Sequence, residues 1–180
     1  MKIIAWDTVE ESTQGGASLP PGGYVARIVR VEDVPAKEYM WVVYDIAEGE
    51  HAGHYSDAFG MSNEWAHRFS RSYKQSAEGM FKAFLNRLEE SNPGRFSIEQ
   101  WQSTGNEHAF VGLEVGIVLQ TEKYTNNKGE DKERLDVVRI YASQDIRGGN
   151  YRIPEPKDRR KEAPTAGAAD SAYYDPIPFS

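Results

Sequence analysis

Two histidines and a carboxylate in the segment HAGHYSD, residues 51–57, are the side chains of this sequence that most suggest metal chemistry. Imidazole and carboxylate groups are common zinc ligands. On a strand, however, positions 51, 54 and 57 alternate between the two faces, and no HExxH pattern places two histidines on one face of a helix. We therefore interpret His51 and His54 as residues of a polar loop. We expect no metal, no other cofactor and no catalytic residue, and a metal-dependent nuclease remains an alternative.

Aromatic and basic side chains on one strand face form a second candidate site. Residues 39–46, YMWVVYDI, have strand composition, and their even positions would face a core. Tyr39 and Trp41 then share the opposite face, with Lys37 just before them. Single-stranded nucleic acid is held by aromatic rings under the bases and basic side chains along the phosphates. We expect Tyr39 and Trp41 to stack on bases, and the alternative is burial of Trp41 against Trp6.

Further basic residues extend this candidate site. Arg27 and Arg139 lie in strand-like segments and are poor core residues, so both should point outward. A hairpin predicted around the turn at residues 125–130 adds a basic and aromatic finger: Lys123, Tyr124, Lys128, Lys132 and Arg134. Acidic residues are interleaved with these lysines. An ordinary solvated turn is therefore the alternative.

The charge balance restricts how such a site could work. The 180 residues include 21 Lys and Arg against 28 Asp and Glu, a net charge of −7. A nucleic-acid site must then be a local basic patch that gains much of its affinity from stacking. The absence of cysteine suits a reducing cytoplasm, and no apolar stretch reaches membrane-spanning length. We expect a cytoplasmic protein with no membrane partner.

The elements that would position these side chains follow from periodicity. Strand patterns cover residues 24–31, 39–46, 54–59, 109–122 and 134–142, and a helical pattern covers residues 64–90. Arg68, Arg71 and Lys74 would form a solvated stripe at the start of the helical pattern. Three strands, a helical insertion and two strands predict a mainly β fold, an OB-fold-like β-barrel of five strands. A generic α+β sandwich is the alternative.

The chain divides into a domain, residues 1–153, and a polar tail, residues 154–180, with the composition of a disordered segment. The tail ends in apolar residues stiffened by prolines, which would suit capture by another protein: Asp175, Pro176, Ile177, Pro178 and Phe179. This ending resembles the tip of bacterial single-stranded-DNA-binding proteins. The resemblance implies replication and repair enzymes as partners. A frayed terminus folded back on the domain is the alternative.

Three segments of the domain share a pattern of glycines and alternating apolar residues: PGGYVARI at residues 21–28, WVVYDI followed by EGEHAG at residues 41–53, and the hairpin at residues 118–138. The pattern resembles phage and prophage single-stranded-DNA-binding proteins with an OB-fold. The resemblance implies a non-enzymatic protein that coats exposed strands in phage DNA replication, recombination or repair. An adaptor or inhibitor whose acidic surface mimics nucleic acid is the main alternative. A homo-oligomer is compatible with either hypothesis.

Overall fold

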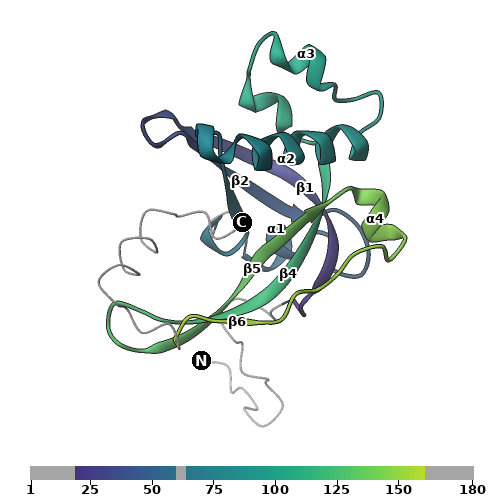
Figure 1. The fold of residues 1–180 in the computed structure, drawn as a ribbon. Coiled ribbons are helices and arrows are strands. Elements are labelled where there is room, and N and C mark those ends of the chain that lie inside the picture. Colours follow the sequence, from purple (N-terminus) through teal and green to yellow (C-terminus); the bar gives the residue numbers. More distant parts are fainter. Residues whose placement is uncertain (1–18, 60–63, 161–180) are drawn as a thin grey trace, which may run out of the picture.

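Strands dominate the part of the chain that the structure describes. The computed structural model describes residues 19–59 and 64–160. One antiparallel sheet has the strand order β3-β2-β1-β4-β5, and a short β6 pairs in parallel with β4 (Figure 1). The strands are β1 Gly22–Val34, β2 Tyr39–Ile46, β3 Arg68–Ser72, β4 Glu114–Thr125, β5 Asp131–Tyr141 and β6 Lys157–Asp158. The predicted mainly β class is therefore confirmed.

Half of the helical segments that the structure describes lie between the third and fourth strands. The α-helices are α1 His54–Phe59, α2 Glu78–Ser91, α3 Ile98–Gln102 and α4 Ser143–Arg147. Single turns of 3₁₀ helix are η2 Pro35–Lys37, η4 Glu64–Ala66, η5 Gln75–Ala77 and η6 Glu107–Phe110. α2 lies across one end of the sheet, where it contacts β3, β4 and β5 (Figure 1). Within the described residues, no helix is long and apolar enough to cross a membrane.

The core lies between one face of the sheet and α2. The even positions of β2 face it, as predicted: Met40, Val42, Tyr44 and Ile46. Ile28 and Val31 of β1 also enter the core although they are three residues apart, because the register of β1 against β2 shifts between Ile28 and Arg30. Such a bulge adds one residue to the strand and so shifts which side chains face the core. It leaves Arg30 in register with Val43, on the outer face.

The end of α2 is joined to the sheet by a buried amide. Asn92 donates from Nδ2 to the carbonyl oxygens of Leu88 and Glu114, both at 2.7 Å. Its Oδ1 accepts from the backbone N–H of Glu114 at 2.9 Å. The helix therefore stops at Asn92, as the Asn-Pro-Gly sequence predicts, and its end is fixed to the start of β4.

The predicted strand at residues 54–59 is wrong, because these residues form α1. Gly53, with a φ of 73°, turns the chain just before the helix, in a conformation that glycine adopts without strain. The carboxylate of Asp45 accepts hydrogen bonds from the backbone N–H groups of Tyr55 and Ser56, at 3.0 and 3.2 Å. These are N–H groups that the first turn of a helix leaves without partners, so Asp45 favours the helix.

The third strand is β3, within the segment that the sequence predicts to be helical. Arg68 and Arg71 lie on β3, and Lys74 follows the strand, so the predicted helical stripe of basic residues is wrong. Arg71 is buried, with its guanidinium carbon 5.0 Å from the ring centroid of Phe69. Burial lowers the pKa of Arg71 to about 10. Five residues are too few for periodicity to separate a strand from a helix.

The segment after α4 returns along the sheet. Residues 157–158 form β6, which pairs with Glu122 and Lys123 of β4 beyond the point where β1 ends its own pairing with β4. Gln120 on β4 also donates from Nε2 to the carbonyl oxygen of Pro154 at 2.7 Å. Part of the segment assigned to the tail therefore belongs to the sheet. The tip at residues 175–179 lies outside the described residues.

Candidate nucleic-acid interface

The outer face of β2 and β3, which is turned away from the core, carries two tryptophans and an arginine in contact. The guanidinium carbon of Arg68 on β3 lies 3.7 Å from the ring centroid of Trp41 on β2 and 3.6 Å from that of Trp65 in η4. We call these residues the Trp-Arg-Trp stack. Trp65 is 79% exposed, more than any other large apolar side chain in the described residues. The stack therefore offers an aromatic ring to solvent.

The strand register explains how the stack is assembled. Val43 is in register with Arg30 on β1 and with Arg68 on β3, so these two arginines lie on either side of one buried valine. Arg30 donates from Nε to Oε1 of Glu64 at 2.8 Å, and its Nη2 contacts Oε2 of the same carboxylate. Glu64 and Trp65 are consecutive residues of η4. Arg30 and Arg68 therefore hold η4 over the outer face at neighbouring points.

The electrostatics of this face differ between the two arginines. The hydrogen bonds to Arg30 lower the pKa of the Glu64 carboxyl, and the same hydrogen bonds raise the pKa of Arg30. Burial lowers the pKa of Arg68, although the nearby carboxylates of Glu32 and Glu64 oppose this shift. A guanidinium stays charged at neutral pH despite such a shift, and contact with a ring does not neutralise it. Arg68 therefore keeps a positive charge beside Trp65.

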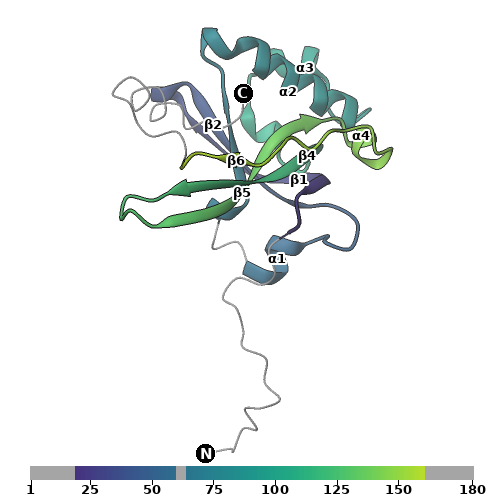
Figure 2. The ribbon, with the colours of Figure 1, turned by 60° about the horizontal axis from the view of Figure 1, so that its bottom comes forward.

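Two loops extend from the sheet near this face. The loop between β1 and β2 and the hairpin between β4 and β5 point toward the same side of the molecule in both views (Figures 1 and 2). Lys37 is exposed in the first loop, within η2. Lys123 and Lys128 are exposed at the base and tip of the hairpin. These predicted residues are therefore exposed on segments that point toward one side of the molecule.

Tyr39 and Trp41 share the outer face, as the alternation of β2 predicts, but they do not form an open pair. Tyr39 is only 8% exposed, and its ring lies edge-on to Trp41 with the centroids 5.5 Å apart. Trp41 is half-buried under Arg68. Tyr39 is in register with Val34 of β1 on one side and with Ser72 of β3 on the other. Its role here is to support Trp41.

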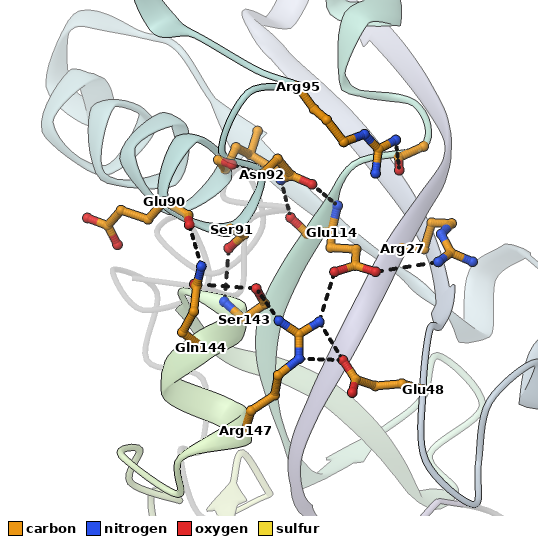
Figure 3. A network of polar contacts seen from close by, with 12 residues as sticks. Arg27, Glu48, Glu90, Ser91, Asn92, Arg95, Glu114, Ser143, Gln144 and Arg147 are labelled. Carbon is orange, nitrogen blue, oxygen red and sulfur yellow. Dashed lines mark hydrogen bonds and ion pairs between the residues drawn. The ribbon is translucent and has the colours of Figure 1, made fainter.

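Arg27 belongs to a network of ion pairs that joins β1, β4 and α4 (Figure 3). Its Nη2 lies 3.4 Å from Oε1 of Glu114, whose other oxygen accepts from Arg147 at 3.0 Å. Arg147 also donates from Nε to Glu48 at 2.8 Å, which ties α4 to the turn after β2. The charge of Arg27 is thus partly neutralised. Arg139 is exposed on β5 and donates to the carbonyl oxygen of Val138.

The predicted finger contains a cluster of buried carboxyl groups. Arg134 lies 5.0 Å from the half-buried ring of Tyr124, but it donates to Glu122 at 2.8 Å and to Asp136 at 3.1 Å. Arg159, just after β6, makes a second ion pair with Glu122. Burial, together with the nearby Glu122, raises the pKa of Asp136 to about 7. Arg134 is therefore already engaged with carboxylates, and the finger is less basic than its sequence suggests.

The histidines pack as aromatic rings. His51 and His54 are half-buried, and the ring of His54 lies edge-on to Tyr55 at 4.8 Å between centroids. Tyr55 stacks on His67, a fully buried residue whose Nδ1 lies 2.5 Å from the carbonyl oxygen of Tyr44. Within the described residues, no three His, Cys, Asp or Glu side chains are placed to hold a metal ion. The side chain of Asp57 lies outside that description.

Sequence reasoning missed Trp65, Arg30 and Glu64. Trp65 falls in the segment predicted to be helical, and the bulge that turns Arg30 outward leaves no mark in the residue pattern. The available signal was a tryptophan three residues before an arginine in a polar stretch, which is weak by itself. Comparison with protein-family models found no match, and a search of curated proteins found no similar sequence.

Proposed function

We propose that this protein binds single-stranded nucleic acid, and DNA in particular, on the outer face of β2 and β3, and that it catalyses no reaction. The supporting observation is the exposed ring of Trp65 beside the charged Arg68. A ring of this kind can stack on any base, while a nearby cation can pair with the phosphates. Binding would then be tolerant of sequence.

The arrangement of the strands supports an OB-fold-like barrel as the scaffold. The two ends of the sheet path, β3 and β5, contact each other, and α2 lies across one end of the curved sheet. In OB-folds the face of strands 2 and 3 binds oligonucleotides, together with the loops between strands 1 and 2 and between strands 4 and 5. On such a scaffold, the Trp-Arg-Trp stack, Lys37 and the β4–β5 hairpin of this chain would occupy the corresponding places.

The wider role that we propose rests on the sequence resemblances. The protein would coat exposed single strands in the cytoplasm during phage DNA replication, recombination or repair. Its tip, Asp175 to Phe179, would recruit partner enzymes. Because the net charge is −7, stacking should supply a larger share of the affinity than phosphate contacts do.

Titration of a labelled oligo-dT followed by fluorescence anisotropy tests the proposal. We expect binding at micromolar protein and low salt, weakened by salt. Replacing Trp65 with Ala should remove one stacked base, worth about 1–3 kcal/mol, and so weaken binding roughly 5- to 150-fold. Met80→Ala is the control, because Met80 is an exposed apolar residue on α2. Failure of the wild type to bind, or equal binding by Trp65→Ala, contradicts the proposal.

An adaptor or inhibitor with an acidic, nucleic-acid-mimicking surface is the second candidate function. The observation that favours it is the presence of Glu32 and Glu64 beside Arg30 on the outer face. This function predicts no oligo-dT binding even at low salt. It also predicts that the protein competes with oligo-dT for a nucleic-acid-binding partner, which an equilibrium competition titration measures.

A further inference from the structure

The guanidinium of Arg30 presents parallel N–H groups, which we call its fork, and in the free protein Glu64 already occupies them. Two nitrogens of the guanidinium meet both oxygens of the carboxylate, and a third contact joins Nη1 of Arg30 to Glu32 at 3.2 Å. The side chains of Arg30 and Glu64 are 42% and 24% exposed, so this pair lies at the surface. A ligand approaching Trp65 would therefore meet the Arg30–Glu64 pair at once.

Carboxylate and phosphate groups fit a guanidinium in the same way. Both offer two oxygens to the parallel N–H groups of the fork, and phosphate groups are common partners of arginine. The carboxylate of Glu64 is thus placed where a phosphate of a bound strand would be placed. Because Trp65 follows Glu64 directly, a base stacked on Trp65 brings its own backbone phosphates close to Arg30.

We propose that Glu64 holds the fork of Arg30 until a phosphate of single-stranded nucleic acid displaces it, so that Glu64 limits the affinity of the site. This inference rests on the proposed function. The pair is only partly buried, so solvent screening limits the free energy that opposes the exchange. The carboxylate released from Arg30 would then be repelled by the neighbouring phosphates. Glu64 would act as an intramolecular competitor for the strand.

A purely structural role for the pair predicts the opposite effect. If Arg30 and Glu64 only hold η4 in place, weakening their contact loosens Trp65 and lowers the affinity for a single strand. If Glu64 competes with phosphate, removing its charge raises the affinity. The sign of the change therefore separates the two roles.

Replacing Glu64 with Gln removes the charge and keeps an oxygen that can accept from Arg30. We expect Glu64→Gln to bind oligo-dT roughly 2- to 5-fold more tightly at low salt. Weaker or unchanged binding by Glu64→Gln overturns the inference.

Glu90→Gln is the matched control. Glu90 on α2 accepts from Nη1 of Arg87 with both oxygens, at 2.9 and 2.8 Å, and its side chain is more exposed than that of Glu64. The control removes the same net charge at a distant surface, so an equal gain in affinity would show a general charge effect and overturn the inference. In addition, Glu64→Gln should give no gain on an Arg30→Gln background, whereas a gain there would exclude Arg30 as the group released.

These outcomes are separate from failure of the proposed function. If the wild type and every variant leave oligo-dT unbound at low salt, the proposed function fails and the inference fails with it. If the wild type binds and Trp65→Ala weakens binding, but Glu64→Gln does not strengthen it, only the inference fails. Thermal unfolding of each variant checks that the fold is retained.

Discussion

Asp136 should make the fold less stable as the pH rises toward 8. Its side chain is 17% exposed and lies beside the buried Glu122, with Arg134 contacting both carboxyl groups. Burial is the main reason that its pKa is raised from 3.8 to about 7, and its contact with Glu122 adds to the shift. Between about pH 4 and 7 the folded protein thus keeps a proton on Asp136 that the unfolded chain has lost. Stability is therefore greatest below that window and falls as the pH rises through it.

The size of this loss of stability follows from the difference between the pKa values of Asp136 in the unfolded and folded protein. The step from 3.8 to about 7 corresponds to at most about 4 kcal/mol, and the slope within the window is at most about 1.4 kcal/mol for each pH unit. Asp136→Asn keeps the shape and cannot ionise, so it removes this slope. The contact with Arg134 is already included in the pKa of Asp136, and solvent screening of this partly exposed group lowers the effect below the maximum. We expect the stability of Asp136→Asn relative to wild type to be about 2 kcal/mol greater at pH 8 than at pH 5.

Urea unfolding at pH 5, 6.5 and 8 measures this difference. Glu133→Gln is the control, because Glu133 is an exposed acid of the same strand, and its profile should run parallel to that of the wild type. The comparison avoids pH values below 5, where Glu122, whose pKa is lowered, begins to lose its own stabilising effect. Parallel profiles for Asp136→Asn and wild type would refute a raised pKa of Asp136 in the folded protein.

Two further predictions concern the packing that supports the sheet. A methyl group at Gly116 would lie 2.6 Å from Ile146 and 2.8 Å from the carbonyl oxygen of Ala142. Gly116→Ala should therefore lower the free energy of unfolding, measured in urea, by about 1–3 kcal/mol. A loss under about 0.5 kcal/mol would contradict this packing. Asn92→Ala leaves the backbone N–H and C=O of Glu114 without their partner, so it should cost about 2–4 kcal/mol in the same assay. An unchanged urea midpoint for Asn92→Ala would show that water replaces the amide.

The sequence predicts the secondary structure well where a periodic pattern of apolar residues extends over a whole strand or helix. The alternation of β2 places Met40 and Val42 in the core, and the apolar spacing of α2 places Phe84 and Leu88 there. It fails at residues 54–72, where short segments are decided by contacts from elsewhere. Asp45, several residues upstream, fixes the start of α1, and no local propensity contains that information.

The candidate site is predictable in part for the same reason. Alternation correctly places Tyr39 and Trp41 on the outer face, but it cannot tell which ring a neighbouring element covers. Trp65 can be recognised as part of the candidate site only once β3 brings Arg68 against its ring. Ion pairing is equally nonlocal, and Arg134 looks available in the sequence because Glu122 is twelve residues away.

The acidity of the chain and a role in binding single strands are compatible because of how its positive charges are distributed. Arg27, Arg134 and Arg147 each form an ion pair with a carboxylate of the protein, and these carboxylates partly neutralise their charges. Arg68 is held instead by two rings, and a ring positions a cation without cancelling its charge. A face built in this way needs bases that are free to stack, and a duplex hides the faces of its bases. An exposed ring on a chain with a net charge of −7 would therefore favour single strands over duplexes in the proposed function.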